Sequence, residues 1–267
     1  MSFSLTHFNG RVASDADLAP LAFTGYAHFT AMQVRDGAVR GLDLHLSRLE
    51  AASTQMFGNH LPDAHIRNYL RGAVDAAPSD ASVTCFVASR PGEFMPAGPG
   101  TDLDVLVKVS DPAKPPIGPL SIDVVSHERH LPHIKHVGEV AKTFYLRRAN
   151  AQGFDDAAFE NSSGRLSEAT IWNLAFWDGD SVIWPEANIL SGVTMQILVR
   201  QLDARGVRQK TRPVRRADLT EGLSAVVMNS WTPGIALTRL GERQLHIDAT
   251  FTRLLHDAYV AEPLVAP

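Results

Sequence analysis

Four prolines fall within nine residues near the middle of the chain, in the segment Asp111-Pro-Ala-Lys-Pro-Pro-Ile-Gly-Pro119. Proline fixes its own φ angle and has no N–H group, so neither a helix interior nor a central strand can pass through this segment. Proline-rich stretches behave as stiff spacers. The sequence therefore predicts two domains, residues 1–110 and 120–267, joined by a stiff linker over 111–119.

Both halves contain helical and strand patterns, which predicts an α+β fold. Helices are expected over 43–57, which Gly58 would end, and over about 63–76, 136–151, 193–205 and 249–259. Strands are expected within 3–35 and over 83–88, 103–109, 122–125, 172–177, 182–184 and 225–228. Residues 90–100 are too rich in glycine and proline for regular structure.

The composition narrows the classes of function. The chain has 267 residues, 45% hydrophobic and 20% charged, which suits an ordinary globular protein. Its net charge of −4 gives no reason to expect nucleic acid or a membrane surface as a partner. The one cysteine, Cys85, lies in an apolar run that reads as a buried strand, and a single cysteine suits a reducing compartment. We expect a cytoplasmic location.

Three chemically different features follow one another between residues 131 and 194. Lys135 follows a turn at Pro132 and stands at the start of a predicted helix, Glu168 follows a hairpin-like segment, and Gly192-Val-Thr194 opens a second helix. Pyridoxal phosphate (PLP) needs an amine to form a Schiff base, a carboxylate to keep its pyridine nitrogen protonated, and a helix N-terminus for its phosphate. The stretch carries all three groups.

The order and spacing of these features resemble the class IV aminotransferases, the fold-type IV PLP enzymes. That family includes branched-chain and D-amino-acid aminotransferases and 4-amino-4-deoxychorismate lyase. The matching residues are Ile134-Lys-His136, Glu168 followed by Asn173, and Leu190-x-Gly-Val-Thr194. The interval from Lys135 to Glu168, 33 positions (168 minus 135), is the family's, and the resemblance covers about residues 8–260. It implies a small N-terminal α/β domain, a larger barrel-like C-terminal domain, a cofactor cleft between them and a homodimer.

The resemblance implies that Lys135 is the catalytic lysine and that Glu168 binds the pyridine nitrogen. Lys142 is the rival amine, seven positions further on, but it does not fit the interval of 33. The alternatives are a surface lysine at 135 and a solvated glutamate at a strand end for 168. We expect Asn173 to be structural.

Phosphate contacts are implied at three places. Arg48, in His45-Leu-Ser-Arg-Leu49, resembles the family's His-x-x-Arg-Leu contact, and a guanidinium can bind two phosphate oxygens at once. The other places are a helix N-terminus and the turn after the strand at 225–228: Val193, Thr194, Ser230, Trp231 and Thr232. Trp231 stands where the family often has a small residue, and the choice between Ser230 and Thr232 is open.

Two departures from the family pattern leave the reaction type open. Thr30 stands where the aminotransferases often carry glutamate, and the lyase branch resembles this chain there. Met195 replaces an arginine that often follows the Gly-Ile-Thr motif. Thr30 and Arg90 are candidate substrate contacts, although a surface salt bridge is an equal alternative for Arg90.

Histidines recur every third residue at His127, His130, His133 and His136. Pro132 interrupts any helix that would align them, and no nearby cysteine or carboxylate pair completes a common zinc ligand set. We expect no metal site.

The resemblance thus implies a PLP-dependent transaminase whose substrates are small amino acids and keto acids. The alternatives are a 4-amino-4-deoxychorismate lyase, which releases pyruvate, and a non-catalytic PLP-binding protein.

Overall fold

The computed structural model describes residues 2–22 and 24–267, which form two compact units. The first unit comprises Met1–Lys114, Ile134–Gly138 and Pro263–Pro267, and the second comprises Pro115–His133 and Glu139–Glu262. The domain boundary predicted at 111–119 places 134–138 and 263–267 in the second domain. In the structure both segments pair through their backbones with strands of the first unit.

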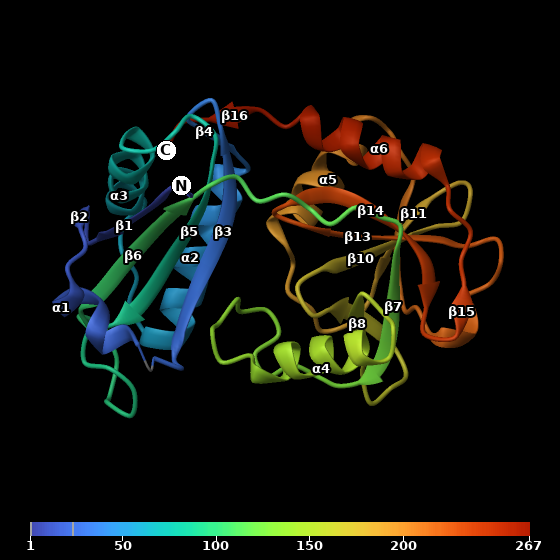
Figure 1. Cartoon of the computed structure of the whole chain (residues 1–267), viewed down its shortest axis with the longest axis horizontal. Coiled ribbons are helices and arrows are strands. Elements are labelled where there is room, and N and C mark those ends of the chain that lie inside the picture. The colour runs from blue at the N-terminus through green and yellow to red at the C-terminus, as the bar shows by residue number, and fades with distance from the viewer. Residues whose placement is uncertain (1, 23) are drawn as a thin grey trace. The chain divides into compact units, whose positions relative to one another are not determined.

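The first unit is built on a seven-stranded sheet in the order β16-β4-β3-β5-β6-β1-β2, with every pairing antiparallel (Figure 1). The strands are β1 (Ser4–Phe8), β2 (Arg11–Val12), β3 (Ala27–Arg35), β4 (Ala38–Arg40), β5 (Ala81–Ser89), β6 (Leu103–Ser110) and β16 (Leu264–Val265). Two short helical turns, α1 (Asp15–Leu18) and η1 (Ala19–Leu21), follow β2.

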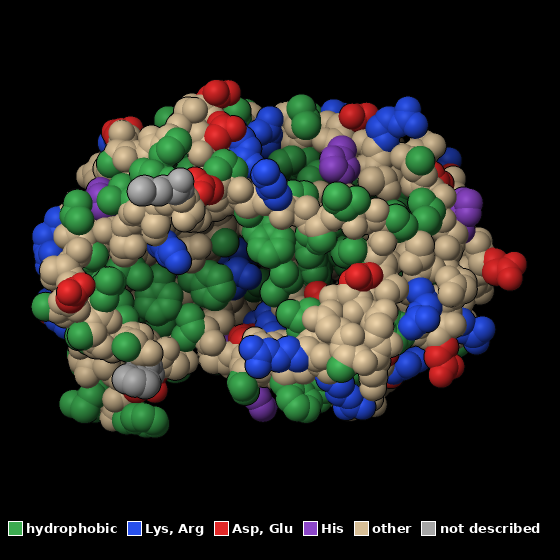
Figure 2. Space-filling view, in the orientation of Figure 1, with side chains coloured by type: hydrophobic (Ala, Val, Ile, Leu, Met, Phe, Trp, Pro, Cys, Tyr) green, Lys and Arg blue, Asp and Glu red, His purple; other side chains and the backbone are tan. Residues whose placement is uncertain are grey.

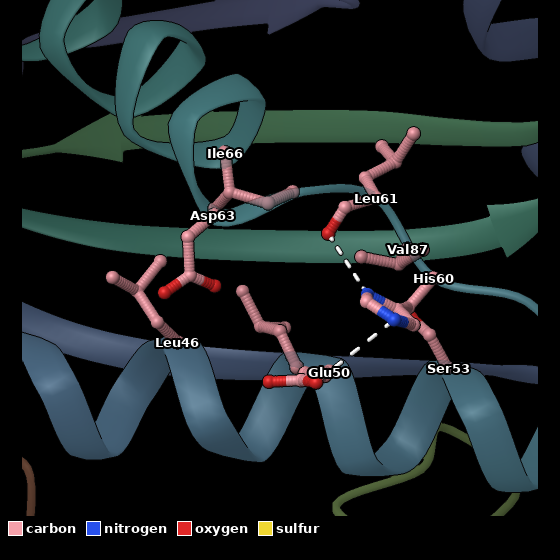
Figure 3. A pocket seen from close by; sticks show the side chains of 9 residues that line it. Leu46, Glu50, Ser53, His60, Leu61, Asp63, Ile66 and Val87 are labelled. Carbon is pink, nitrogen blue, oxygen red and sulfur yellow. Dashed lines mark hydrogen bonds and ion pairs between the residues drawn. The ribbon is translucent and has the colours of Figure 1, made fainter.

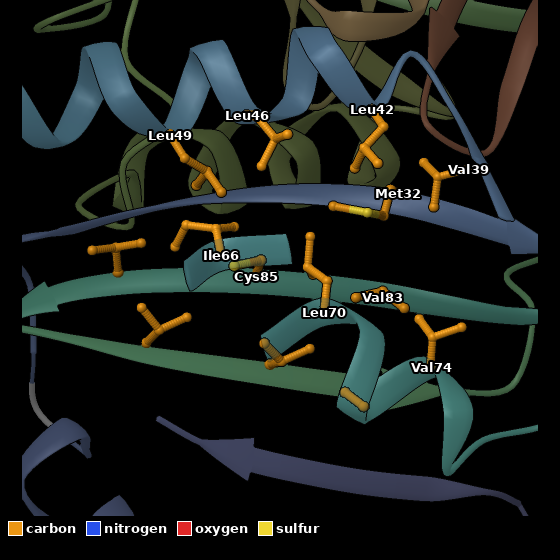
Figure 4. Packing of buried hydrophobic residues seen from close by; sticks show 14 of the residues in the cluster. Met32, Val39, Leu42, Leu46, Leu49, Ile66, Leu70, Val74, Val83 and Cys85 are labelled. Carbon is orange, nitrogen blue, oxygen red and sulfur yellow. The ribbon is translucent and has the colours of Figure 1, made fainter. Parts of the chain in front are cut away.

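Two helices, α2 (Leu42–Phe57) and α3 (Asp63–Asp75), pack against this sheet. On α2, Leu42, Leu46 and Leu49 recur at helical spacing and are buried against strand residues such as Met32 (Figure 4). Gly58 ends α2 with φ +68°, a conformation that glycine adopts without strain. The predicted helix and its predicted stop are confirmed.

The second unit contains a closed six-stranded barrel. Pairing runs β10-β13-β14-β7-β8-β9, and the ring closes where Asn173 of β10 lies opposite Glu168 of β9. The barrel strands are β7 (Leu120–Ser126), β8 (Asp156–Glu160), β9 (Leu166–Ala169), β10 (Asn173–Trp177), β13 (Ser224–Asn229) and β14 (Thr232–Leu240). Three further strands extend the sheet: β11 (Val182–Pro185), β12 (Gln209–Arg212) and β15 (Arg243–Gln244). The predicted α+β class with a barrel-like second part is confirmed.

Three helices pack on the barrel strands: α4 (Val140–Ala151), α5 (Val193–Ala204) and α6 (Ala249–Val260). A 3₁₀ turn, η2 (Arg216–Asp218), precedes β13. One apolar core fills the barrel, around Leu174, Phe176 and Val227. A separate core lies between α5, α6 and the sheet, around Leu198 and Phe251.

The helix expected over 136–151 begins only at Val140, so this prediction was wrong for its first four residues. Residues 134–138 instead lie extended beside β3, where the Phe29 N–H donates to the Lys135 carbonyl at 2.9 Å and the Val137 N–H donates to the Ala27 carbonyl at 3.0 Å. These backbone bonds to a distant strand override the local helical pattern. Lys135 therefore does not stand at a helix N-terminus. Lys142 lies on α4, and Lys135 lies on the extended segment before it.

Among the described residues, no helix is long and apolar enough to cross a membrane. On the face shown in Figure 2, basic side chains are interspersed with acidic ones over each unit.

Candidate functional site

Lys135 lies in the extended segment 134–138 of the first unit and is partly buried. Its Nζ lies 4.8 Å from the centre of the Phe29 ring, close enough for a cation–π contact. The two backbone bonds on either side of it, from Phe29 and Val137, fix the peptide from which the side chain extends. A lysine placed on paired backbone is oriented more firmly than one on a free loop.

The same unit places Thr30, His45 and Arg48 near this lysine. Thr30 Oγ1 and His45 Nδ1 are hydrogen-bonded at 2.6 Å, and both side chains are buried. Burial lowers the pKa of His45 to about 3, and the positive charges of Arg48 and Lys135 act in the same direction while Asp43 opposes them. Burial also lowers the pKa of Arg48 to about 10, which leaves it charged at neutral pH. Neutral His45 thus lies beside two cations, an arrangement suited to a bound anion.

Glu168 lies in the middle of β9 in the second unit, and only 4% of the residue is exposed. Its Oε1 accepts a hydrogen bond from Arg129 Nη1 at 2.7 Å. Because a buried carboxylate is stable as an ion only when it is paired, this contact explains how Glu168 is tolerated there. The alternative of a solvated strand-end glutamate does not apply.

Sequence reasoning missed Arg129 and Glu139. Arg129 also donates from Nε to Glu139 Oε1 at 2.6 Å and from Nη1 to the Pro132 carbonyl at 2.8 Å. Its spacing from these partners follows no motif, so the sequence held no signal for the contacts. A cavity of about 300 Å³ in this unit is lined by residues that include Glu128, Arg129, His130, Asn161, Glu168 and Asn188.

Lys142, the rival amine, lies in the first turn of α4. Its Nζ is 3.9 Å from Glu139 Oε1, and the pKa of Lys142 is lowered chiefly by burial, with Arg129 adding to the effect. Lys142 therefore belongs to the same charged group as Arg129 and Glu139.

Asn173 fixes the start of α5. Its side-chain nitrogen donates to the Leu190 carbonyl at 2.7 Å, and a Cβ atom on Gly192 would overlap its amide oxygen. Only glycine fits at 192 while Asn173 holds the loop in this way. The structural role expected for Asn173 agrees with these contacts.

Val193 and Thr194 form the first turn of α5, next to the β13–β14 hairpin. Thr194 Oγ1 donates to the Asn229 carbonyl at 2.8 Å, which ties the helix start to the hairpin turn at Ser230 and Trp231. Both Val193 and Thr194 are buried. The first N–H groups of a helix lack internal partners, so this end of the barrel offers donors to an anion.

The turn itself carries Trp231, whose backbone N–H donates to Asn229 Oδ1 at 2.8 Å. The Trp231 ring contacts the edge of Trp172 at 5.7 Å between centroids, and 39% of the residue is exposed. Thr232 begins β14, is buried and accepts from the Gly234 N–H at 3.3 Å. The structure thus brings Val193, Thr194 and the residues of this turn to one end of the barrel.

Arg90 is engaged with two carboxylates of its own hairpin. It pairs with Asp102 at 3.1 Å and with Asp104 at 2.8 Å, and 55% of its side chain is exposed. This is the surface ion pair that the sequence left open as an alternative. A role in binding substrate stays a prediction.

The histidines at 127–136 do not form a ligand set. His127 packs against Tyr145 and Phe159, at 5.2 and 4.8 Å between ring centroids, and His136 forms a backbone bridge with His28. Within residues 2–22 and 24–267, no group of three or more His, Cys, Asp or Glu side chains is placed to hold a metal ion.

A second cavity, in the first unit, lies between α2, α3 and β5 (Figure 3). It is lined by Glu50, Ser53, His60 and Asp63 among others, and His60 lies 3.9 Å from Glu50. Its volume of about 10 Å³ is that of a single water molecule, so it is not a ligand site.

The donor groups present suit PLP. The first unit supplies a primary amine at Lys135 and a partly buried guanidinium at Arg48 near it. The second supplies a buried, ion-paired carboxylate at Glu168 and a helix N-terminus that only glycine at 192 permits. An amine, a cation, a carboxylate and a helix N-terminus are the kinds of group that PLP binds.

Three solved structures illustrate what the fold resembles. A branched-chain aminotransferase from Thermoproteus uzoniensis with norvaline has a TM-score of 0.81 at 16% identity, over 97% of this chain and 94% of that one. An aminotransferase from Brucella abortus bound to PLP has a TM-score of 0.79 at 19% identity, over 97% and 98%. A candidate 4-amino-4-deoxychorismate lyase from Legionella pneumophila has a TM-score of 0.80 at 16% identity, over 90% and 92%. At such identities the likeness shows the fold alone.

No curated relative matches the sequence. The family model described as amino-transferase class IV matches residues 27–240, which is most of the chain. The chain therefore belongs to the class IV aminotransferases, the fold-type IV family of PLP-dependent enzymes.

Proposed function

We propose that this protein is a transaminase that moves an amino group between a small amino acid and a keto acid, with Lys135 as its catalytic lysine. Family membership supports the reaction class. The observation that carries the proposal is the buried, ion-paired carboxylate of Glu168. Burying an ionised carboxylate costs free energy of desolvation, so its presence in a protein interior points to a function. Binding a pyridine nitrogen that must stay protonated is such a function.

Bound PLP supplies an aldehyde for the substrate amine and a ring that withdraws electrons from the substrate Cα. In our proposal the Lys135 amine would hold the cofactor at that aldehyde and, once free, would carry the proton of the substrate Cα. Glu168 would accept the hydrogen bond of the ring nitrogen. Lys142 remains the rival amine, and its contact with Glu139 supports a structural role instead.

The phosphate is assigned to Arg48, to the start of α5 at Val193 and Thr194, and to the turn from Ser230 to Thr232. Arg48 is a charged, partly buried guanidinium near Lys135, and the α5 start and the hairpin turn are joined by the bond from Thr194 to Asn229. Thr194 Oγ1 uses its proton in that bond, so we assign the backbone N–H groups of the first turn as the principal donors there.

A second candidate is release of pyruvate from 4-amino-4-deoxychorismate. One observation favours it: Thr30, in place of the glutamate common in aminotransferases, is fully buried with its hydroxyl bound to His45. The Legionella pneumophila neighbour is named for that lyase reaction. Both reactions begin with loss of the Cα proton, so the residues that hold the cofactor serve either.

A homodimer and a cytoplasmic location are parts of the proposal. Phe94 is fully exposed and the adjacent Met95 is 59% exposed, on the loop between β5 and β6. Apolar side chains displayed in this way favour burial by a partner, and a second copy of the chain is the partner we propose. A single buried cysteine suits a reducing compartment.

The test is a screen of amino donors and keto-acid acceptors against the PLP-loaded protein, read by absorbance. Conversion of bound pyridoxal to pyridoxamine phosphate by an amino acid supports transamination. Pyruvate from 4-amino-4-deoxychorismate, without that conversion, supports the lyase. A protein that binds PLP but produces neither change would be a carrier, and the proposal would be wrong.

A further inference from the structure

Arg129 is held on three sides in the segment between β7 and α4. Its side chain is only 2% exposed. It donates to Glu168 at 2.7 Å, to Glu139 at 2.6 Å and to the Pro132 carbonyl at 2.8 Å. A planar guanidinium with bonds along several edges has a fixed orientation, which a lysine ammonium could not reproduce.

Several charged groups surround Glu168. Those that face it or line the cavity beside it are Arg129, Glu139, Lys142, Asp156, Glu128 and His130. Asp156 on β8 accepts bonds from Thr170 and Trp172, at 2.6 and 2.8 Å, and burial raises its pKa. Of the cations in this set, Arg129 is the one that hydrogen-bonds Glu168, whereas Lys142 acts on it only through its charge.

The geometry of the bond leaves Glu168 able to bind a second partner. Arg129 Nη1 donates to Oε1, and a carboxylate has about four acceptor positions on its two oxygens. On another edge of the same guanidinium, Arg129 Nε donates to Glu139 Oε1. Arg129 therefore steadies Glu168 without using up its capacity as an acceptor.

We propose that Arg129 is the positioning residue that keeps Glu168 ionised and oriented for the pyridine nitrogen of PLP, while Glu139 holds the guanidinium in place. This inference rests on the proposed function, because the role of Glu168 is part of that proposal. Without Arg129, Glu168 would be an unpaired buried carboxylate, which favours its protonated form. A protonated Glu168 cannot keep the ring nitrogen charged.

The experiment compares Arg129→Gln and Arg129→Lys with Arg200→Gln in the PLP-loaded protein. Arg200 donates from Nε to the buried Glu262 at 2.9 Å in the same unit, so Arg200→Gln is a control that removes an arginine from another buried carboxylate. Three quantities are measured: the dissociation constant for PLP, the ¹⁵N chemical shift of its ring nitrogen, and the pH dependence of kcat. Melting temperature reports whether each variant is folded.

For Arg129→Gln we expect the ring-nitrogen shift to move towards the unprotonated value. We also expect the acid limb of the kcat profile to move up by about one pH unit or more, with KM little changed. In Arg129→Lys both changes should be smaller than in Arg129→Gln, because lysine keeps the positive charge but cannot make the three hydrogen bonds of the guanidinium. Arg200→Gln should lower only the melting temperature.

Equal ring-nitrogen shifts and equal acid limbs in the wild type and in the Arg129 variants would overturn the inference and leave Arg129 a structural residue. If Arg129→Gln does not fold, Arg129→Lys decides the question with the same two measurements. A wild-type protein that binds no PLP, or shows no protonated ring nitrogen, would instead contradict the proposed function. The two failures are therefore distinguishable.

Discussion

The side-chain oxygen of Asn173 occupies the space that a Cβ atom on residue 192 would need, so the first turn of α5 can approach β10 only with glycine there. The Asn173 amide nitrogen meanwhile donates to the Leu190 carbonyl at 2.7 Å. One side chain thus sets both the path of the loop and the identity of the residue that opens the helix.

Gly192→Ala should lower the affinity for PLP, because the added methyl group displaces either the loop or Asn173 and with it the N–H donors of α5. Binding of PLP is followed by absorbance titration. The double variant with Asn173→Ala should lose less PLP-binding free energy than the two single variants lose together, since removing the Asn173 side chain removes the clash. Strict additivity in this double-mutant cycle would refute the steric explanation.

Glu168→Gln should leave PLP bound but lower turnover by several orders of magnitude, because the amide carries no charge to hold the ring proton. Steady-state kinetics and the absorbance of the bound cofactor test this. Glu186→Gln is the control, since Glu186 belongs to an exposed ion pair with Arg165 in the same unit. Unchanged turnover in Glu168→Gln would mean that another group faces the ring nitrogen.

Stability should fall as the pH falls below the ordinary pKa of histidine, about 6.5. Burial lowers the pKa of both His28 and His45 to about 3, so between these values the unfolded chain binds protons that the folded chain does not. Between these two pKa values, each histidine lowers the free energy of unfolding by at most about 1.4 kcal/mol for each unit by which the pH falls. Above the higher value it adds no pH dependence. Urea unfolding at about pH 7 and about pH 5 measures the effect.

His28→Gln should reduce this pH dependence, whereas His65→Gln should not, because His65 is exposed on α3. Should both variants keep the wild-type dependence, the buried histidines are not its source.

Cys85 should resist thiol reagents until the protein opens. It is fully buried on β5, and burial raises the pKa of its thiol to about 12, so almost no reactive thiolate is present at neutral pH. The rate of labelling should rise with denaturant in step with unfolding. Ser47→Cys in a Cys85→Ser background, at an exposed position of α2, should label at once. Rapid labelling of native Cys85 would contradict the packing of this sheet.

The sequence was most informative where local pattern and local chemistry agreed. The helical spacing of Leu44, Leu49, Ala52 and Met56, with Gly58 as the stop, predicted a helix over 43–57, and α2 begins one residue earlier and ends at the same residue. Gly192 marked the start of α5. At these places the signals for a helix and for its ends lie within the helix itself, so no distant part of the chain is needed to interpret them.

The sequence failed where distant segments decide the structure. Residues 134–138 have a helical pattern yet lie extended, because their backbone partners are Ala27 and Phe29, more than a hundred positions earlier. Arg129 pairs with Glu168 across 39 positions at no recognisable spacing. Tertiary contacts of this kind override local propensity and leave no local trace.

The central claim is that the amine at 135 is the one that binds the cofactor, and borohydride reduction of the PLP-loaded protein tests it most directly. Reduction fixes the bound pyridoxal to its lysine, and peptide mapping locates the adduct. The account predicts an adduct on Lys135 that is lost in Lys135→Ala and kept in Lys142→Ala. An adduct on Lys142, or one that survives Lys135→Ala, would contradict it.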